Sequence, residues 1–242
     1  MKHIHRFFVS TRLSTGDSAC LDEDDSFHAS RVLRLKEGDA IELADAGGHI
    51  YTASVTNVDR RVEVRTGGEL ETTAATVALT VAQSIPGGSK MDLIVEKLSE
   101  LGVDRLVPLF TQNSVAAQGS LSDRKVDRWR RVARAAAAQA RRTGIMRVDR
   151  PRNLGSWLDE ADGGLIALVT ETEGTPLAGA FQGMDGRLSL VIGPEAGFTP
   201  AELELLEGAG AVFAVLGPLV LRTETAALVA VSVIMHRAGI IG

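Results

Sequence analysis

The hydrophobic pattern of the chain changes near residue 75, and this change limits the possible folds more than any other feature. Before it, short segments alternate apolar and polar residues, whereas after it continuous apolar runs alternate with segments at helical spacing. Apolar strands that alternate with helices are typical of a parallel sheet covered on both faces. The predicted strands are 76–82, 105–110, 165–169, 188–192 and 212–216, and the predicted helices are 89–101, 122–142, 200–209 and 223–237.

Residues 1–70 form a first predicted domain, because short strands separated by turn residues are typical of a small β-barrel. Asp45-Ala46-Gly47-Gly48 joins two alternating segments and predicts a hairpin. The polar stretch from Gly67 to Ala74 is interpreted as a linker to an α/β domain over residues 75–242. The predicted strands of the first domain are 5–9, 40–44, 49–58 and 61–65, with a short helix at 26–35.

Composition permits a packed core, since 45% of the 242 residues are hydrophobic and 24% are charged. The one cysteine, Cys20, cannot form an internal disulfide, which fits a reducing cytoplasm. The longest apolar run, Ala226 to Met235, is too short to cross a bilayer, and the charged start does not resemble a secretory signal. We therefore expect a cytoplasmic protein with no membrane span. The five histidines lack ligand spacing, so we also expect no metal site.

Basic residues are concentrated in one part of an acidic chain. Residues 124–152 hold ten Arg and one Lys against two Asp, which gives this segment a charge of +9 although the whole chain carries −5. Arginine suits forked contacts with phosphate, and a local basic face is a better sign of a polyanion partner than the overall charge. A solvated helix surface is the alternative explanation.

Two loops near the end of the chain carry the strongest functional signal. Residues 192–198 (Ile-Gly-Pro-Glu-Ala-Gly-Phe) and 216–226 (Leu-Gly-Pro-Leu-Val-Leu-Arg-Thr-Glu-Thr-Ala) each follow a predicted buried strand. The carboxyl ends of parallel strands meet at one edge of a sheet, where open α/β sheets usually bind small molecules. The two loops therefore predict a ligand cleft.

Some residues of these loops have a structural explanation. Thr199, Pro200 and Glu202 match the N-cap, the first helical position and the capping-box position of a helix. Arg222 and Glu224 lie where a buried strand gives way to a very apolar helix, and charges in such places are usually paired or functional. An Arg222–Glu224 ion pair is thus the alternative to a role in chemistry.

The two loops resemble those of the knotted, SPOUT-class methyltransferases, and specifically the ribosomal RNA small subunit methyltransferase E family. The resemblance extends over nearly the whole chain. His28 with Arg31-Val32-Leu33-Arg34 is similar to the family's amino-terminal PUA-like barrel, residues 90–115 to its first strand–helix–strand unit, and Arg128-Trp129 to its basic helix. Membership implies a carboxy-terminal trefoil knot, a homodimer with the site at its interface, and methylation of uridine N3 in 16S ribosomal RNA of the small ribosomal subunit with S-adenosylmethionine (SAM).

The resemblance also implies site residues, which are carried over position by position. The implied SAM contacts are Thr170, Glu171, Gly193, Pro194, Glu195, Gly197, Leu216, Gly217, Leu221, Arg222, Thr223 and Ala226. The implied RNA contacts are Arg31, Arg34, Arg128, Arg131, Gln139, Arg141 and Arg142.

The implied reaction is an in-line methyl transfer to a base that has left its stack. The uridine N3–H must lose its proton, and negative charge then builds on the base carbonyls. Arg222 is the candidate for stabilising this charge. Glu195 or Glu224 orients the base or takes the proton, and the sequence does not distinguish between them.

The chain departs from the family pattern on the RNA side of the cleft. Leu219 stands where the family usually has Arg, and Gln112-Asn113-Ser114 stands where it usually has Glu-Arg-Ser. These two lost cations motivate two alternatives: a non-catalytic RNA-binding or ribosome-assembly protein on the same fold, and a knotted methyltransferase that acts on another RNA. A protein that binds some other nucleotide is a third.

Overall fold

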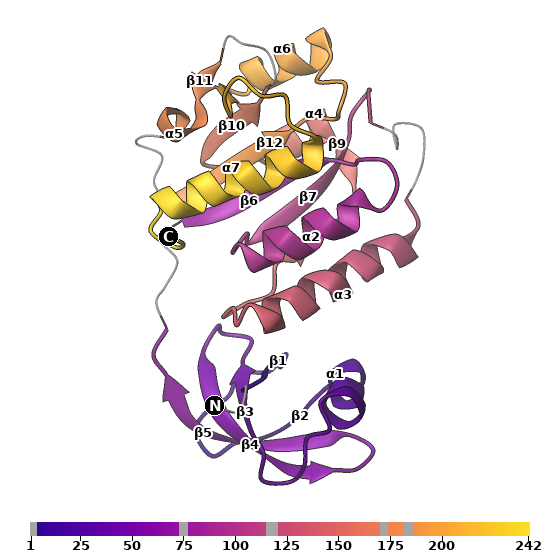
Figure 1. Ribbon diagram of the computed structural model, residues 1–242, viewed down its shortest axis with the longest axis vertical. Coiled ribbons are helices and arrows are strands. Elements are labelled where there is room, and N and C mark those ends of the chain that lie inside the picture. Colours follow the sequence, from indigo (N-terminus) through magenta and orange to yellow (C-terminus); the bar gives the residue numbers. More distant parts are fainter. Residues whose placement is uncertain (1–3, 73–76, 115–120, 170–173, 182–185) are drawn as a thin grey trace. The chain divides into compact units, whose positions relative to one another are not determined.

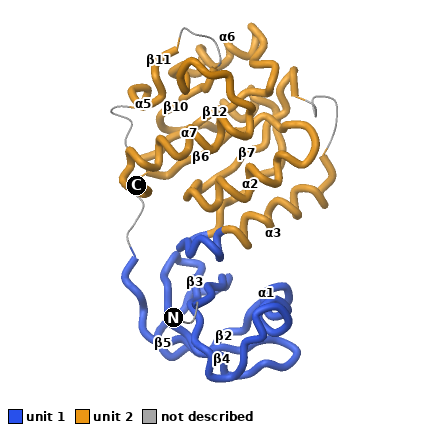
Figure 2. Tube along the Cα trace, in the orientation of Figure 1, with its two compact units in different colours: residues 1–74, 137–144 blue, residues 75–136, 145–242 orange. Residues whose placement is uncertain are grey.

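The computed structural model describes residues 4–72, 77–114, 121–169, 174–181 and 186–242. The chain forms two compact units (Figure 2). Unit 1 comprises residues 1–74 and 137–144, and unit 2 comprises residues 75–136 and 145–242. The structure thus assigns to the first unit a short segment from the middle of the chain, which the sequence pattern did not predict.

Unit 1 is built on a curled five-stranded sheet with the order β1-β3-β4-β5-β2. Its core consists of the inward-facing apolar residues of these strands, among them Ile41, Leu43, Val62 and Val64, which are at most 1% exposed. The predicted hairpin at 45–48 is confirmed, because β3 and β4 pair antiparallel across it. The elements are β1 (Arg6–Phe8), β2 (Ser18–Cys20), α1 (Glu23–Phe27), the π-helical turn η1 (His28–Val32), β3 (Ala40–Ala44), β4 (Ile50–Val58) and β5 (Val62–Leu70).

The prediction of a linker that begins at Gly67 is wrong, because β5 continues through Gly67 and Gly68 to Leu70. Leu70 pairs with Ile50 at the far end of β4. Glycine is needed here for packing rather than flexibility, since a Cβ at Gly67 would lie 2.5 Å from the Thr52 hydroxyl oxygen. A Gly-Gly pair in a strand therefore gave the same sequence signal as a linker.

Residues 137–144 belong to unit 1 because Arg6 on β1 binds their backbone. The Arg6 guanidinium donates to the carbonyl oxygens of Arg141 and Arg142 and forms an ion pair with Glu42 on β3 at 2.7 Å. The predicted helix 122–142 ends earlier, as α3 spans Asp123–Gln139. Arg141 then adopts a positive φ of 55°, a left-handed conformation that ends the helix before the expected Gly144.

Unit 2 contains a parallel sheet covered by helices on both faces, as the sequence predicts. The strand order is β11-β13-β10-β12-β6-β7-β8, and β9 pairs with β7. The elements are β6 (Val77–Ser84), α2 (Lys90–Glu100), β7 (Arg105–Phe110), α3, β8 (Arg147–Val148), β9 (Arg152–Asn153), α4 (Leu154–Leu158), β10 (Gly164–Leu168), β11 (Thr175–Pro176), α5 (Leu177–Ala180), β12 (Gly186–Ile192), α6 (Pro200–Gly208), β13 (Val212–Val215) and α7 (Thr223–Arg237).

Alternation along the strands divides the core into two layers. Leu188, Leu190 and Ile192 of β12 pack toward α2 and α7, whereas Val191 packs toward α4 and α6 (Figure 1). The two layers bury β6, β10 and β12 on both faces, which explains their continuous apolar sequences. β10 pairs with both β12 and β13, so the strands that precede the two predicted loops end at the same edge of the sheet.

Candidate functional site

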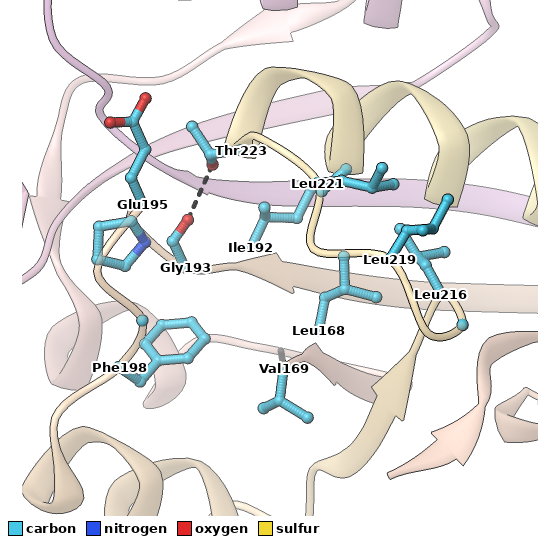
Figure 3. Close-up of a pocket in the computed structure, with 14 residues that line it drawn as sticks. Leu168, Val169, Ile192, Gly193, Glu195, Phe198, Leu216, Leu219, Leu221 and Thr223 are labelled. Carbon is cyan, nitrogen blue, oxygen red and sulfur yellow. Dashed lines mark hydrogen bonds between the residues drawn. The ribbon is translucent and has the colours of Figure 1, made fainter. Parts of the chain in front are cut away.

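A pocket lies at the carboxyl ends of β10, β12 and β13, where the sequence predicts a cleft (Figure 3). Its walls come mostly from the loop after β12 and the loop between β13 and α7. Leu168, Leu216 and Leu221 supply apolar surface, and the backbone of Gly193 supplies polar groups. The lining residues are Leu168, Val169, Ile192, Gly193, Pro194, Glu195, Gly197, Phe198, Leu216, Gly217, Leu219, Leu221, Thr223 and Ala226.

The loop after β12 folds back on itself at Gly193. The Phe198 ring turns toward Gly193, and a Cβ on this glycine would lie 3.0 Å from the ring. The side-chain amide of Asn113 donates to the Gly197 carbonyl oxygen at 3.1 Å and holds the loop from the β7 side. Asn113, one of the two departures from the family pattern, therefore has a structural role beside the pocket.

A buried hydrogen-bond chain ties the two pocket loops together. Gln83, at the end of β6, donates from Nε2 to the Thr223 hydroxyl oxygen at 2.9 Å. The same hydroxyl donates to the Gly193 carbonyl oxygen at 2.9 Å (Figure 3). Gln83 is fully buried and Thr223 is 4% exposed, so water does not compete for these bonds. The chain fixes the start of α7 against the loop after β12.

Charged residues from three elements meet beside this pocket. Lys90, the first residue of α2, donates to the Glu195 carboxylate and lies 3.6 Å from the Glu224 carboxylate oxygen Oε2. The hydrogen bond to Glu195 raises the pKa of Lys90 above its ordinary value. The same bond, reinforced by the charge of Arg222, lowers the pKa of Glu195. Lys90 is thus a cation and Glu195 an anion at neutral pH.

Most of the SAM contacts implied by resemblance meet at this pocket. Nine of them line it: Gly193, Pro194, Glu195, Gly197, Leu216, Gly217, Leu221, Thr223 and Ala226. Arg222 is exposed at the N-cap of α7 and is not among the lining residues. Thr170 and Glu171 lie outside the described residues. Within the described part of the chain, Glu224 pairs with Lys90 rather than with Arg222.

Sequence reasoning missed Lys90 and two lining residues, Leu168 and Val169. Ile192, Phe198 and Leu219 lie in the two predicted loops but were not among the implied SAM contacts. Leu168 and Val169 end the predicted strand 165–169, so extending the site back into that strand by two residues would have included them. Nothing in the local sequence marks Lys90, because Ser-Lys-Met-Asp is an ordinary helix start. The interpretation of Thr199 and Glu202 as a capping box is confirmed, and Glu202 also accepts from the backbone N–H of Gln112 at 2.9 Å.

The implied RNA contacts are divided between the two units. Arg31, Arg34, Gln139, Arg141 and Arg142 belong to unit 1, and Arg128 and Arg131 lie on α3 in unit 2. Several of these side chains have acidic neighbours. Arg128 pairs with Asp92 on α2 at 2.8 Å, and Arg141 lies 3.5 Å from Glu42. Arg34, with a φ of 54°, follows the π-helical turn η1, a local irregularity that is common at functional sites.

Comparisons with known proteins decide the family. The model for an RNA methyltransferase domain matches residues 73–235, and the model for an RNA methyltransferase PUA domain matches residues 21–65. Ribosomal RNA small subunit methyltransferase E of Mycobacterium bovis is 34% identical over 235 residues, which cover 94% of this chain and 90% of that relative. The chain belongs to the ribosomal RNA small subunit methyltransferase E family.

Solved structures of similar proteins agree with this membership. Ribosomal RNA small subunit methyltransferase E from Neisseria gonorrhoeae, in a crystal structure bound to S-adenosyl methionine, has a TM-score of 0.88 at 27% identity, with 97% of this chain and 98% of that chain covered. A Legionella pneumophila structure in complex with the bound cofactor SAM has a TM-score of 0.84 at 28% identity, with 97% and 98% covered. The predicted family and the α/β fold with a PUA-like unit are confirmed.

Within the described part of the chain, no helix is long and apolar enough to span a membrane. No group of three or more His, Cys, Asp or Glu side chains in the described ranges is arranged to hold a metal ion.

Proposed function

We propose that the protein is a SAM-dependent methyltransferase that methylates N3 of a uridine in 16S ribosomal RNA. The observation that carries the proposal is the pocket at the carboxyl ends of β10, β12 and β13, which is lined by nine residues that the family resemblance implies as SAM contacts. Family membership supports ribosomal RNA as the substrate.

The pocket residues fit the chemical groups of SAM. Leucine side chains and the Phe198 ring offer apolar surface for a flat base such as adenine. Glu195 carries a negative charge, because Lys90 and Arg222 lower its pKa, and it lines a pocket proposed for a cationic ligand. When bound, the cofactor supplies an electrophilic methyl group. The chain's own residues must then position the uridine, remove its N3 proton and stabilise the charge that remains.

Of the two candidate carboxylates, we assign the N3 proton to Glu224. The lowered pKa of Glu195 makes it a weaker base, and Lys90 already occupies its carboxylate. Glu224 has a side chain that is only 12% exposed, and its Oε2 has no hydrogen-bond partner among the described residues. Oε2 is buried and lies 3.6 Å from Lys90 Nζ, so in this proposal entry of the base exposes it and offers the hydrogen bond that it lacks.

Arg222 completes the proposed site as the residue that stabilises charge. It is the N-cap residue of α7, adjacent to the pocket-lining residues Leu221 and Thr223, and its guanidinium is always charged. Loss of the N3 proton places negative charge on the two uridine carbonyl oxygens, and a nearby cation lowers the energy of that state. Lys90 supplies a second positive charge that balances the two carboxylates.

Methyl-transfer assays with SAM and small-subunit ribosomal RNA or particles test the proposal. Arg222→Ala should lower kcat at least a hundredfold with little loss of RNA affinity. Glu224→Gln should lower kcat more than Glu195→Gln does. Mapping of modified uridines in ribosomal RNA from cells that lack the protein identifies the target. Intact SAM binding without transfer to any ribosomal substrate would instead favour a non-catalytic RNA-binding protein.

We also propose a trefoil knot and a homodimer for unit 2, on the basis of the family resemblance. Leu219 and Val220, in the loop between β13 and α7, are 75% and 81% exposed, and adjacent exposed apolar side chains support contact with a second copy. Light scattering coupled to size-exclusion chromatography measures this state. A monomer at concentrations that support full activity would refute the dimer.

A further inference from the structure

Unit 2 has a second depression, at the edge of the sheet away from the pocket. Its lining includes four arginines, Arg130, Arg147, Arg150 and Arg152, and one carboxylate, Asp149. The arginines come from α3, β8, β9 and the turn between these two strands, whereas the pocket is formed at β10, β12 and β13. The order of the sheet places β6 and β7 between the strands of the two sites. We refer to this surface as the arginine depression.

Asp149 organises the arginine depression. Its carboxylate is 4% exposed and accepts from Arg105 at 2.6 and 3.0 Å. Arg147 lies 2.7 Å from it, and Arg152 lies 3.9 Å from it. One buried negative charge therefore holds three guanidinium groups within 4 Å. A fixed carboxylate that orients more positive charge than it neutralises is the arrangement of a preorganised anion site.

The outer arginines have charge available for a ligand. Arg147 and Arg150 have side chains that are 70% and 71% exposed. The remaining acidic neighbours, Asp123, Asp127 and Glu160, have side chains that are 57–72% exposed. Ion pairs of such exposure are weak and exchange readily with water or with a stronger anion.

The lining residues identify the chemical class of the ligand. Arginine forks match the paired oxygens of a phosphate group. The other lining residues, Ile145, Met146 and Val148, are aliphatic, so the described lining offers no aromatic ring on which a base could stack. Contacts to phosphate without base contacts position an RNA and do not read its sequence.

We propose that the arginine depression binds the phosphodiester backbone of RNA and forms an anchoring site separate from the SAM pocket. This inference rests on the proposed function, because an RNA substrate is the polyanion that such a protein meets. It assigns a role to arginines that the family resemblance leaves unassigned. RNA that is held at this edge of the sheet reaches the pocket only if it extends past β7 and β6.

The double variant Arg147→Ala/Arg150→Ala tests the site, since both side chains are exposed and their removal should leave the fold intact. Binding of a small-subunit ribosomal RNA fragment is measured without SAM as a function of salt. Loss of two phosphate contacts should reduce the slope of log K against log salt concentration by about 1.4–1.8. The dissociation constant in 50 mM salt should rise at least tenfold.

Arg187→Ala/Arg237→Ala is the matched control. It removes the same charge from the same unit, and the Arg187 side chain is 71% exposed and pairs with Asp162. SAM affinity and the melting temperature should be unchanged in both variants. An unchanged salt slope in the test variant, an equal loss in the control, or a wild-type protein that does not bind RNA would overturn the inference. RNA binding with the expected slopes but no methyl transfer would refute the proposed function, whereas the inference that the arginine depression binds RNA would remain supported.

Discussion

Replacing Thr223 with valine tests whether one hydroxyl group holds the pocket loops together. The substitution keeps the shape of the side chain but removes the atom that accepts from Gln83 and donates to Gly193, each at 2.9 Å. Thr223 is 4% exposed, so the new methyl group replaces a hydrogen-bonding group in a nearly dry site. The main effect is therefore the loss of partners for two polar groups.

These two groups differ in what replaces the lost bond. Gly193 lines the pocket, where water can reach its carbonyl oxygen. Gln83 is fully buried, and its Nε2 retains only the bond to the Ser84 carbonyl oxygen, with one N–H left without a partner. A buried donor without a partner costs about 1–3 kcal/mol. For a chain of this size we expect the melting temperature to fall by roughly 2–12 °C.

The loops should also bind the cofactor less tightly, because their bound arrangement is no longer fixed before binding. We expect the dissociation constant for SAM, measured by calorimetry, to rise about fivefold to tenfold, which corresponds to about 1–1.4 kcal/mol. Thr223→Ser restores the hydroxyl and should recover the affinity. If Thr223→Val binds SAM as tightly as the wild type, or if the serine variant binds no better than the valine variant, the hydrogen-bond chain does not position the pocket.

Three further substitutions have defined outcomes. Lys90→Met should raise the pKa of Glu195 toward its ordinary 4.5, as followed by carbon-13 NMR titration, and an unshifted midpoint would contradict the ion pair. Burial alone would raise the pKa of Asp45, but hydrogen bonds from backbone N–H groups outweigh burial and lower this pKa below 3.8. The ionised carboxylate therefore stabilises the fold above pH 3.8, and this contribution is lost as the pH falls through the lowered pKa. Asp45→Asn should abolish this acid sensitivity and cost about 1–3 kcal/mol in urea unfolding at pH 7, because one N–H loses its acceptor. Gly163→Ala should cost about 2–4 kcal/mol, since φ is +79° and a Cβ would overlap a β12 carbonyl, whereas Gly186→Ala, with φ +84° and no neighbour within 4 Å, should cost less.

The parts of the fold that depend on local sequence could be predicted from it. α7 spans Thr223–Arg237 and β7 spans Arg105–Phe110, as their apolar patterns predict. The pocket loops could be found because Gly-Pro ends each strand, and because parallel strands bring their carboxyl ends to one edge.

Residues that act across long sequence separations could not be found in this way. Lys90 and Glu195 are 105 positions apart and meet because β6 pairs with β12, a register that no spacing in the sequence encodes. Gln83 could not be found for the same reason, since its hydrogen-bond partner Thr223 lies 140 positions away in the sequence. Gly67 was misread for a different reason: its requirement comes from the Thr52 hydroxyl on the neighbouring strand, and only the pairing of β4 with β5 shows it.

The basic segment, residues 124–152, is only partly helical, which bears on whether its positive charge serves a polyanion partner. A solvated helix surface was the alternative to polyanion binding, yet α3 carries only six of the eleven basic residues between 124 and 152. The other five follow the helix, where three of them, Arg147, Arg150 and Arg152, line the arginine depression. The only two carboxylates of the segment, Asp127 and Asp149, are each used to orient arginines. Helix solubility does not require positive charge beyond the helix, so the residues after α3 favour a polyanion partner even though the chain carries −5 overall.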